Sequence, residues 1–215
     1  MTTTGDMSQT ADFINALFEP DDLIELRPIE TWEQDRKKKS RLVGRRYLRA
    51  KQIQDAFAWL TTISRTEKAN AFFGVAPREQ EGHGKKEHIR RVRCLWADLD
   101  DCTVEQALER CNRAGLPRPS VIVRSGHGVH LYWLLTDPIA ILAPTNGELH
   151  QSGLRIENLV KALCDLLGRK SCGSGADRVH DLSRLLRLPG FPNMKNARHE
   201  QVPTPCELVE CDPGR

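Results

Sequence analysis

The segment Val92-Arg93-Cys94-Leu95-Trp96-Ala97-Asp98-Leu99-Asp100 alternates with a period of two residues, as a β-strand does. Asp98 and Asp100 therefore share one face of a predicted strand, and the opposite face carries the apolar residues Leu95, Ala97 and Leu99. Two carboxylates this close repel each other unless a positive charge lies between them. Hard divalent cations such as Mg²⁺ or Mn²⁺ fill that position by binding carboxylate, water and phosphate oxygens together. A DxD pattern by itself also occurs at exposed strand ends, so the metal-site hypothesis depends on the residues that accompany it.

The remaining sequence predicts a mixture of helices and strands. Helices are expected at 10–18, 48–64, 103–114, 154–168 and, as a short segment, 178–184. Strands are expected at 23–29, 70–76, 92–100, 120–124, 129–135 and 185–189, with one late strand in the tail. The basic segment 36–46 has no hydrophobic period and predicts a mobile loop, and Asp101 is expected to cap helix 103–114. Because the turn between 124 and 129 is tight, its two strands must pair antiparallel, which indicates an α+β fold.

Composition bounds the class of protein. The chain has 215 residues, of which 39% are hydrophobic and 28% are charged, as in ordinary soluble globular proteins. Its seven cysteines include no CxxC pair and predict reduced, mostly buried thiols rather than a disulfide framework or a zinc ribbon. No apolar run is long enough to span a bilayer, and the polar start has no signal-peptide core, so a cytosolic (cytoplasmic) protein without a membrane partner is expected. Residues 1–9 are expected to be disordered, 10–210 to form one domain, and 211–215 to begin a linker.

The net charge of +3 is small, but the basic residues are clustered. Segment 36–51 contains no acidic residue, and a second basic cluster at 85–93 precedes the carboxylate pair. Two such clusters near a possible metal site favour a phosphate-rich partner, although either cluster alone could be a solvated surface. The residues expected to contact nucleic acid are Lys37, Lys38, Lys39, Arg45, Arg46, Arg90 and Arg91.

The turn Ser125-Gly126-His127-Gly128-Val129-His130 joins two apolar strands. Its two glycines allow a sharp turn and a close approach to a ligand, and exposed amides in such a turn can meet phosphate oxygens. His130 begins the returning strand and can donate a hydrogen bond to a phosphate. The turn predicts a phosphate site that also includes Arg124, whereas His127 is expected to be an exposed turn residue.

A two-metal site usually needs a third carboxylate from another element. Asp177 follows a Gly/Ser-rich turn and is one candidate, and Asp181 is its competitor. Asp181 could instead pair with Arg184 or Arg178 if the segment 178–184 is helical. Further along, Arg187 and Lys195 could neutralise the charge of a triphosphate.

In order, the chain reads WADLD, SGHGVHLYW and ADRVHDLSRLLRLPGFPNMKN. This combination resembles the archaeo-eukaryotic primase superfamily, most closely the RepB-like primase–polymerase domains of phage and plasmid replication proteins. The first family motif, DxD, is matched by Asp98 and Asp100. The second, SGxGxH, is matched by Ser125, Gly126, Gly128 and His130. The third is an acid ahead of an RLPGxxNxK-like run, matched by Asp177 or Asp181 with Arg187, Pro189, Gly190, Asn193 and Lys195.

The resemblance covers about residues 20–200 and also includes the stretch FFGVAPR at 72–78. It implies an RRM-like antiparallel sheet with an N-terminal α/β module, and an active site in the groove between them. It also implies a DNA primase or DNA-dependent polymerase that makes or extends strands from NTPs or dNTPs on a single-stranded DNA template. Its catalytic residues would be Asp98, Asp100, His130 and Asp177, and two Mg²⁺ or Mn²⁺ ions would lie about 3.5–4 Å apart.

Helicase domains usually follow in replication proteins of this group, which makes a helicase domain or subunit an expected partner. Two alternatives from other classes stay open. One is a non-catalytic nucleic-acid-binding domain of a replication initiator, which would keep the fold without the chemistry. The other is a metal-dependent nuclease, which would give the SGxGxH turn no role.

Overall fold

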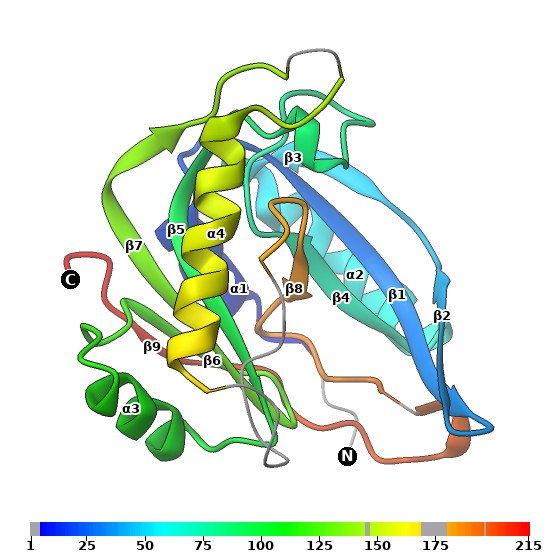
Figure 1. Cartoon of the computed structure of the whole chain (residues 1–215). Coiled ribbons are helices and arrows are strands. Elements are labelled where there is room, and N and C mark those ends of the chain that lie inside the picture. Colours follow the sequence, from blue (N-terminus) through cyan, green and yellow to red (C-terminus); the bar gives the residue numbers. More distant parts are fainter. Residues whose placement is uncertain (1–4, 145–146, 169–179, 196) are drawn as a thin grey trace.

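Two antiparallel β-sheets form the framework of the chain, and helices pack between and around them (Figure 1). The structure is a computed structural model that describes residues 5–144, 147–168, 180–195 and 197–215. The first sheet has the strand order β2-β1-β4-β8, with β3 also paired to β1, and the second has the order β5-β7-β6-β9. The predicted α+β class is therefore confirmed.

The strands of the first sheet are β1 (Leu23–Gln34), β2 (Lys37–Leu42), β3 (Arg46–Arg49), β4 (Ala69–Gly74) and β8 (Leu185–Arg187). Those of the second sheet are β5 (Arg91–Asp100), β6 (Val121–Arg124), β7 (Gly128–Ala140) and β9 (Glu207–Cys211). The α-helices are α1 (Met7–Leu17), α2 (Ile53–Thr66), α3 (Val104–Arg113) and α4 (Gln151–Leu166). Short 3₁₀ turns lie at Ala50–Gln52, Lys86–His88 and Ala197–His199. Among the described residues, no helix is both long and apolar enough to cross a membrane.

The first helix begins earlier than the sequence predicts. The Asp6 carboxylate accepts hydrogen bonds from the main-chain N–H groups of Ser8 and Gln9, at 3.0 and 3.3 Å, and so caps α1. Met7 to Gln9 are therefore helical, which corrects the expectation of disorder for that part of 1–9. Residues 1–4 lie outside the described ranges.

The segment predicted as a mobile loop, 36–46, instead contains β2. This strand pairs antiparallel with β1 in a register that sets Trp32 opposite Lys39 and Glu33 opposite Lys38. The reversal occurs at Asp35 and Arg36, whose φ angles of 51° and 59° lie in the left-handed region. Every β2 side chain is exposed, so the strand has no hydrophobic period for the sequence to reveal. Backbone hydrogen bonds to β1 are what define it.

Two further local predictions were wrong, because side chains form local hydrogen bonds with the main chain that the sequence pattern did not indicate. Thr103, not Asp101, caps α3: its hydroxyl accepts from the Gln106 N–H at 3.3 Å, and the Gln106 side chain accepts from the Thr103 N–H at 3.0 Å. Residues 180–184 form a turn rather than a helix, and residues 178–179 lie outside the described ranges. The Asp181 carboxylate accepts from both the N–H and the hydroxyl of Ser183, at 2.7 Å each.

Helix α1 holds the two sheets together. The Phe13 ring is fully buried and meets Phe73 of β4 and Tyr132 of β7 edge to face, at centroid distances of 5.0 and 5.3 Å. On the other side of the second sheet, α4 packs along β5 (Figure 1). The apolar contacts of α1 therefore set the separation of the sheets, and with it the dimensions of any cavity between them.

The cysteines within the described ranges are free thiols, as predicted. All of them are buried except the half-buried Cys211. Burial raises the pKa of the Cys94 thiol to about 12 and that of Cys206 to about 12. These groups are protonated at neutral pH and behave as small apolar side chains.

Candidate active site

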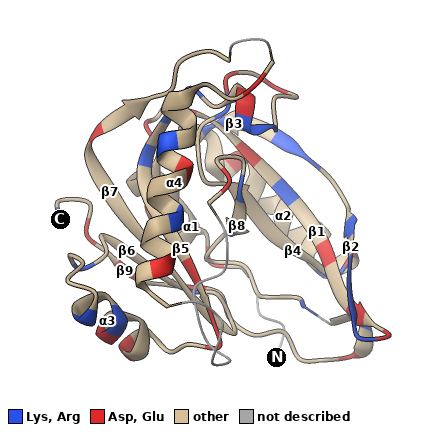
Figure 2. Cartoon of the chain, in the orientation of Figure 1, with Lys and Arg blue, Asp and Glu red and all other residues tan. Residues whose placement is uncertain are grey.

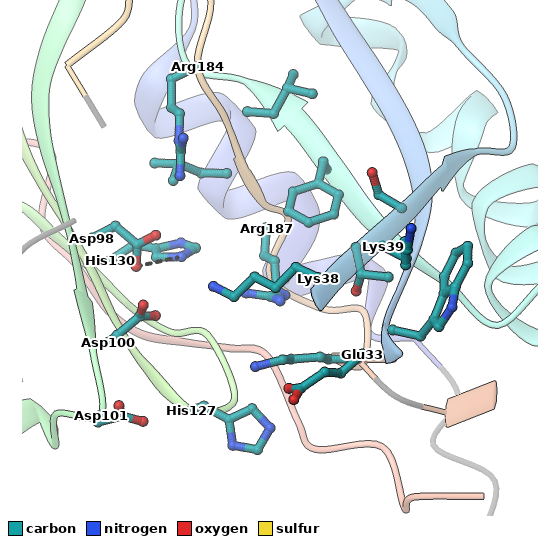
Figure 3. Close-up of a pocket in the computed structure, with 17 residues that line it drawn as sticks. Glu33, Lys38, Lys39, Asp98, Asp100, Asp101, His127, His130, Arg184 and Arg187 are labelled. Atoms are coloured by element: carbon teal, nitrogen blue, oxygen red, sulfur yellow. Dashed lines mark ion pairs between the residues drawn. The ribbon is translucent and has the colours of Figure 1, made fainter. Parts of the chain in front are cut away.

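A cavity of about 460 Å³ lies between the two sheets, with carboxylates on one side and cationic side chains on the other (Figure 3). The second sheet and its neighbouring turns contribute Asp98, Asp100, Asp101, His127 and His130. The rest of the lining comes from β1, β2, β4, β8 and the segments beside β8: Thr31, Trp32, Glu33, Lys38, Lys39, Ser40, Phe72, Arg184, Leu185, Leu186, Arg187 and Lys195.

The carboxylate side follows from the pairing of β5 with β7. Asp98 lies opposite His130 and Asp100 opposite Gly128, so both acids and the histidine point to the same face of the sheet. This places Asp98, Asp100 and His130 in the cavity together, on the face that the sequence predicts (Figure 3). The Asp98 side chain is only 12% exposed, and its Oδ1 lies 3.5 Å from Nε2 of His130.

His130 is fully enclosed and electrically neutral at physiological pH. Burial, together with the positive charges of Arg187 and Arg184, lowers the pKa of its imidazole to about 3. The Tyr132 hydroxyl lies 3.5 Å from its Nδ1, at the limit of a hydrogen bond. A neutral imidazole has one N–H to donate and one nitrogen that accepts, so His130 can orient a polar ligand without adding a charge.

Two arginines on or beside β8 face the carboxylates. Arg187 donates from Nε to Oδ1 of Asn70 at 3.3 Å, and its guanidinium carbon lies 5.5 Å from the Phe72 ring centroid. Burial lowers the pKa of Arg187, and the nearby Asp98 and Asp100 charges oppose that shift, so the group stays protonated. The Nε of Arg184 is buried and has no hydrogen-bond partner within the described part of the chain. The sequence predicts Arg184 only as a possible partner of Asp181, because its spacing does not show that the turn at Asp181 places it at the cavity.

A basic arm forms the outer rim of the cavity. We use this name for residues 31–40, where the β1–β2 ribbon extends past Glu30, the last β1 residue that pairs with β4. Figure 2 shows basic residues along β2 on this side of the molecule. Lys38 and Lys39 line the cavity, whereas Lys37 lies at the exposed tip. The arm thus brings two of the predicted nucleic-acid contacts to the cavity.

The glycine turn is built as predicted, but its residues divide between two places. Arg124 lies opposite Val129 in the ladder, whereas His130 lies opposite Val123, so Arg124 points to the other face of the sheet. It forms an ion pair with Glu207 at 2.8 Å and lines a neighbouring hollow of about 470 Å³ together with Gly126, His127 and Gly128. Arg124 is therefore not a neighbour of His130 in the cavity, contrary to the prediction.

Ser125 and the two glycines shape the turn. The Ser125 residue is buried, and its carbonyl accepts a hydrogen bond from Nδ2 of Asn193 at 2.9 Å. Gly126 has a φ of 101°, and a Cβ on Gly128 would lie 2.2 Å from the carbonyl oxygen of Leu99. Both glycines are thus required by the backbone itself.

The other predicted nucleic-acid contacts have partners within the chain. Arg45 pairs with Glu25 at 3.2 Å, and Arg90 pairs with Glu79 at 2.9 Å. The Arg46 guanidinium stacks 4.5 Å over the Trp59 ring. Arg91 forms ion pairs with Glu19 and Asp22 and begins β5, whose length separates it from Asp100 by about 30 Å.

Two of the three predicted metal ligands, Asp98 and Asp100, lie in the cavity. Asp98 and Asp100 fit a hard divalent cation, because they present two carboxylates in one polar cavity. Asp177 lies outside the described residues. Asp181 is exposed, closes its own turn and does not line the cavity. Within the described ranges, no group of three or more His, Cys, Asp or Glu side chains is arranged to hold a metal ion.

Similar solved structures support the fold, whereas the sequence itself matches no known family. No family model matches the sequence, and no curated protein matches it. Among solved structures, the AEP domain of the primase–polymerase of cyanophage S-2L superposes with a TM-score of 0.60 at 20% identity, covering 98% of this chain and 96% of that one.

Two structures of the primase RepB′ are also similar. One superposes with a TM-score of 0.55 at 14% identity, covering 96% of this chain and 57% of that one. The other, a catalytic domain in complex with initiator DNA, gives a TM-score of 0.50 at 15% identity, covering 95% and 86%. The chain thus has the fold of archaeo-eukaryotic primase catalytic domains, as the motifs predicted.

Proposed function

We propose that this chain, which has a primase-type catalytic fold, is a DNA primase–polymerase that joins nucleotides on a DNA template. The observation that carries the proposal is the cavity itself: Asp98 and Asp100 line one side, and Arg184, Arg187 and Lys195 line the other. Nucleotidyl transfer needs both sides, because a triphosphate and its metal ions bring opposite charges to one place.

The carboxylate side would hold the cations. Asp98 and Asp100 are the proposed ligands for two Mg²⁺ or Mn²⁺ ions, with Asp177 proposed as the third acid. Such ions lower the pKa of the attacking 3′-hydroxyl and neutralise the leaving pyrophosphate. The role of the protein here is to hold two negative charges close together on a paired strand, whose backbone hydrogen bonds fix their positions.

The cationic side would bind the triphosphate. Arg187 and Arg184 present guanidinium groups that suit phosphate oxygens, and among the described residues the buried Nε of Arg184 has no acceptor. Lys195 adds a further cation at the edge of the cavity. Neutral His130, beside Asp98, would donate its N–H to a phosphate oxygen and so orient the nucleotide.

The basic arm would contact the template strand. Lys38 and Lys39 line the cavity and are exposed, so they can reach phosphates of a strand that leaves it. Binding through such lysines weakens steeply with salt, because condensed counterions are released from the nucleic acid. The similar RepB′ catalytic domain was solved with initiator DNA, which supports DNA as the partner class.

The test is metal-dependent incorporation of labelled nucleotides on a single-stranded DNA template. The double variant Asp98→Asn with Asp100→Asn should lose incorporation by at least about a thousandfold. It should keep its circular dichroism spectrum and its affinity for DNA. Asp137→Asn, the same change at an exposed residue of β7, is the matched control and should remain active. Full synthesis by the double variant would refute the proposal.

The same assay separates the two alternatives. A non-catalytic initiator domain would bind DNA but incorporate nothing with any nucleotide or metal. A nuclease would shorten the template when metal is present and nucleotides are omitted.

A further inference from the structure

We infer that Asn70 is a positioning residue, which acts through Arg187 to set how the cationic side of the cavity faces the carboxylates. The inference rests on the proposed function, because it assigns Arg187 the task of holding a triphosphate. Asn70 does not line the cavity, and none of the sequence motifs includes it.

The Asn70 amide is fully buried and makes a complete set of hydrogen bonds. Its Oδ1 accepts from the Met194 N–H at 2.9 Å and from Nε of Arg187 at 3.3 Å. Its Nδ2 donates to the Thr31 hydroxyl at 2.9 Å and to the Ile29 carbonyl at 3.4 Å. An asparagine amide can accept two hydrogen bonds and donate two, so this side chain has no capacity left for another partner.

These four bonds connect three separate parts of the first sheet and its surroundings. Ile29 and Thr31 belong to β1, Arg187 to β8, and Met194 to the segment that presents Lys195. Thr31, Arg187 and Lys195 all line the cavity. One buried amide thus joins the start of the basic arm to Arg187 of β8 and to the segment that presents Lys195.

The geometry at Arg187 gives the amide a directing role. A free arginine side chain explores many rotamers, and fixing them costs free energy at the moment of binding. The bond to Nε and the Phe72 ring at 5.5 Å fix the plane of the guanidinium before any ligand arrives. Arg187 lies in the cavity with the carboxylates of β5 (Figure 3), and the charges of Asp98 and Asp100 act on its guanidinium.

The test is a double-mutant cycle between Asn70→Ala and Arg187→Ala. In the incorporation assay, Asn70→Ala should raise KM for the nucleotide about tenfold and change kcat by less than about threefold. This is expected because the lost binding energy is the same in the ground state and in the transition state. When Arg187 is already alanine, Asn70→Ala should raise KM by no more than about twofold further. Calorimetric titration with inorganic triphosphate and Mg²⁺ should give the same pattern in Kd.

Two further variants separate positioning from stability. Asn70→Ser keeps a small polar group but cannot reach Arg187, so it should reproduce the KM effect if the alanine variant does not fold. Thr10→Val removes another buried hydrogen bond, to the Pro189 carbonyl at 2.8 Å, at a residue outside the cavity lining. It should lower the melting temperature without changing KM.

The outcomes distinguish this inference from the proposed function. The role of Asn70 is overturned, and the proposed function kept, if the wild type is active and neither Asn70→Ala nor Asn70→Ser changes KM. The same conclusion follows if the effects of Asn70→Ala and Arg187→Ala on KM multiply independently. A wild type that neither incorporates nucleotides nor binds triphosphate overturns both.

Discussion

The substitution Gly128→Ala tests how closely β7 must approach the strand that carries the carboxylates. A Cβ on Gly128 would lie 2.2 Å from the Leu99 carbonyl oxygen and 3.0 Å from the Asp100 Cα. Both are backbone atoms of β5, so no flexible side chain can move aside. Overpacking of this kind costs about 3 kcal/mol at the upper end of its usual range. Alanine returns roughly 0.4–1 kcal/mol by restricting the unfolded chain, which leaves about 2 kcal/mol of net destabilisation.

For a chain of this size that net cost lowers the melting temperature by roughly 4–8 °C. Thermal unfolding followed by circular dichroism measures it. Gly214→Ala is the matched control, because its Cβ would meet only Oδ1 of Asp212 at an ordinary 3.6 Å, and its melting temperature should change by no more than about 1–2 °C. Since β5 must shift to accommodate the methyl group, Gly128→Ala should also lower kcat/KM for incorporation at least about tenfold. A variant that melts within about 1 °C of the wild type and retains full activity would refute this reasoning.

Three other perturbations follow from the same structure. Phe13→Ala, which empties the contact between the sheets, should cost about 3–5 kcal/mol in chemical denaturation, and a loss below about 1 kcal/mol would show that α1 does not hold the sheets together. Lys38→Gln with Lys39→Gln should weaken binding to a single-stranded oligonucleotide and reduce the salt slope of log Kd by about 1.4, whereas an unchanged slope would place the strand elsewhere. Glu210→Gln should lower the melting temperature at pH 7 by a few degrees at most, for a loss of no more than about 1 kcal/mol. Hydrogen bonds from Arg118 and then Arg215 lower the pKa of Glu210 to about 2, although burial opposes this shift. The contribution of Glu210 to stability is therefore present above the unfolded pKa of about 4.3 and is lost as the pH falls toward 2. A gap between Glu210→Gln and wild type that stays constant down to pH 2 would contradict that sign.

The parts of the fold that the sequence predicts well are those with a local period or a short connection. The alternation in 92–100 predicts both the strand and the face on which Asp98 and Asp100 lie. In β5 the two side chains share one face, as predicted. The tight turn after Arg124 requires an antiparallel hairpin, and β6 pairs with β7 in that way. In both cases the physical cause acts within a few residues, so the sequence contains all of it.

The missed features depend on contacts between distant segments. The face of Arg124 follows from the register that sets it opposite Val129, and residue type does not reveal a register. Arg184 enters the cavity because the Asp181 turn directs it there. Asn70 did leave a signal: an asparagine within a buried, otherwise apolar strand is uncommon and must find hydrogen-bond partners. Only the structure identifies Arg187 and Met194 as those partners.

The interleaving of the two sheets also has a consequence for biosynthesis. Strand β8 pairs with β4 of the first sheet, with Leu186 opposite Phe73, and β9 pairs with β6 of the second sheet. In each pair the later strand follows the earlier one by more than eighty residues. A nascent chain that has emerged only as far as α4 therefore holds the carboxylates of β5 but not Arg184 and Arg187, which face them. Pairings so distant in sequence slow folding, because loop closure must precede their stabilisation. The cavity, with both its carboxylate side and its cationic side, is therefore complete only after nearly the whole segment has been synthesised.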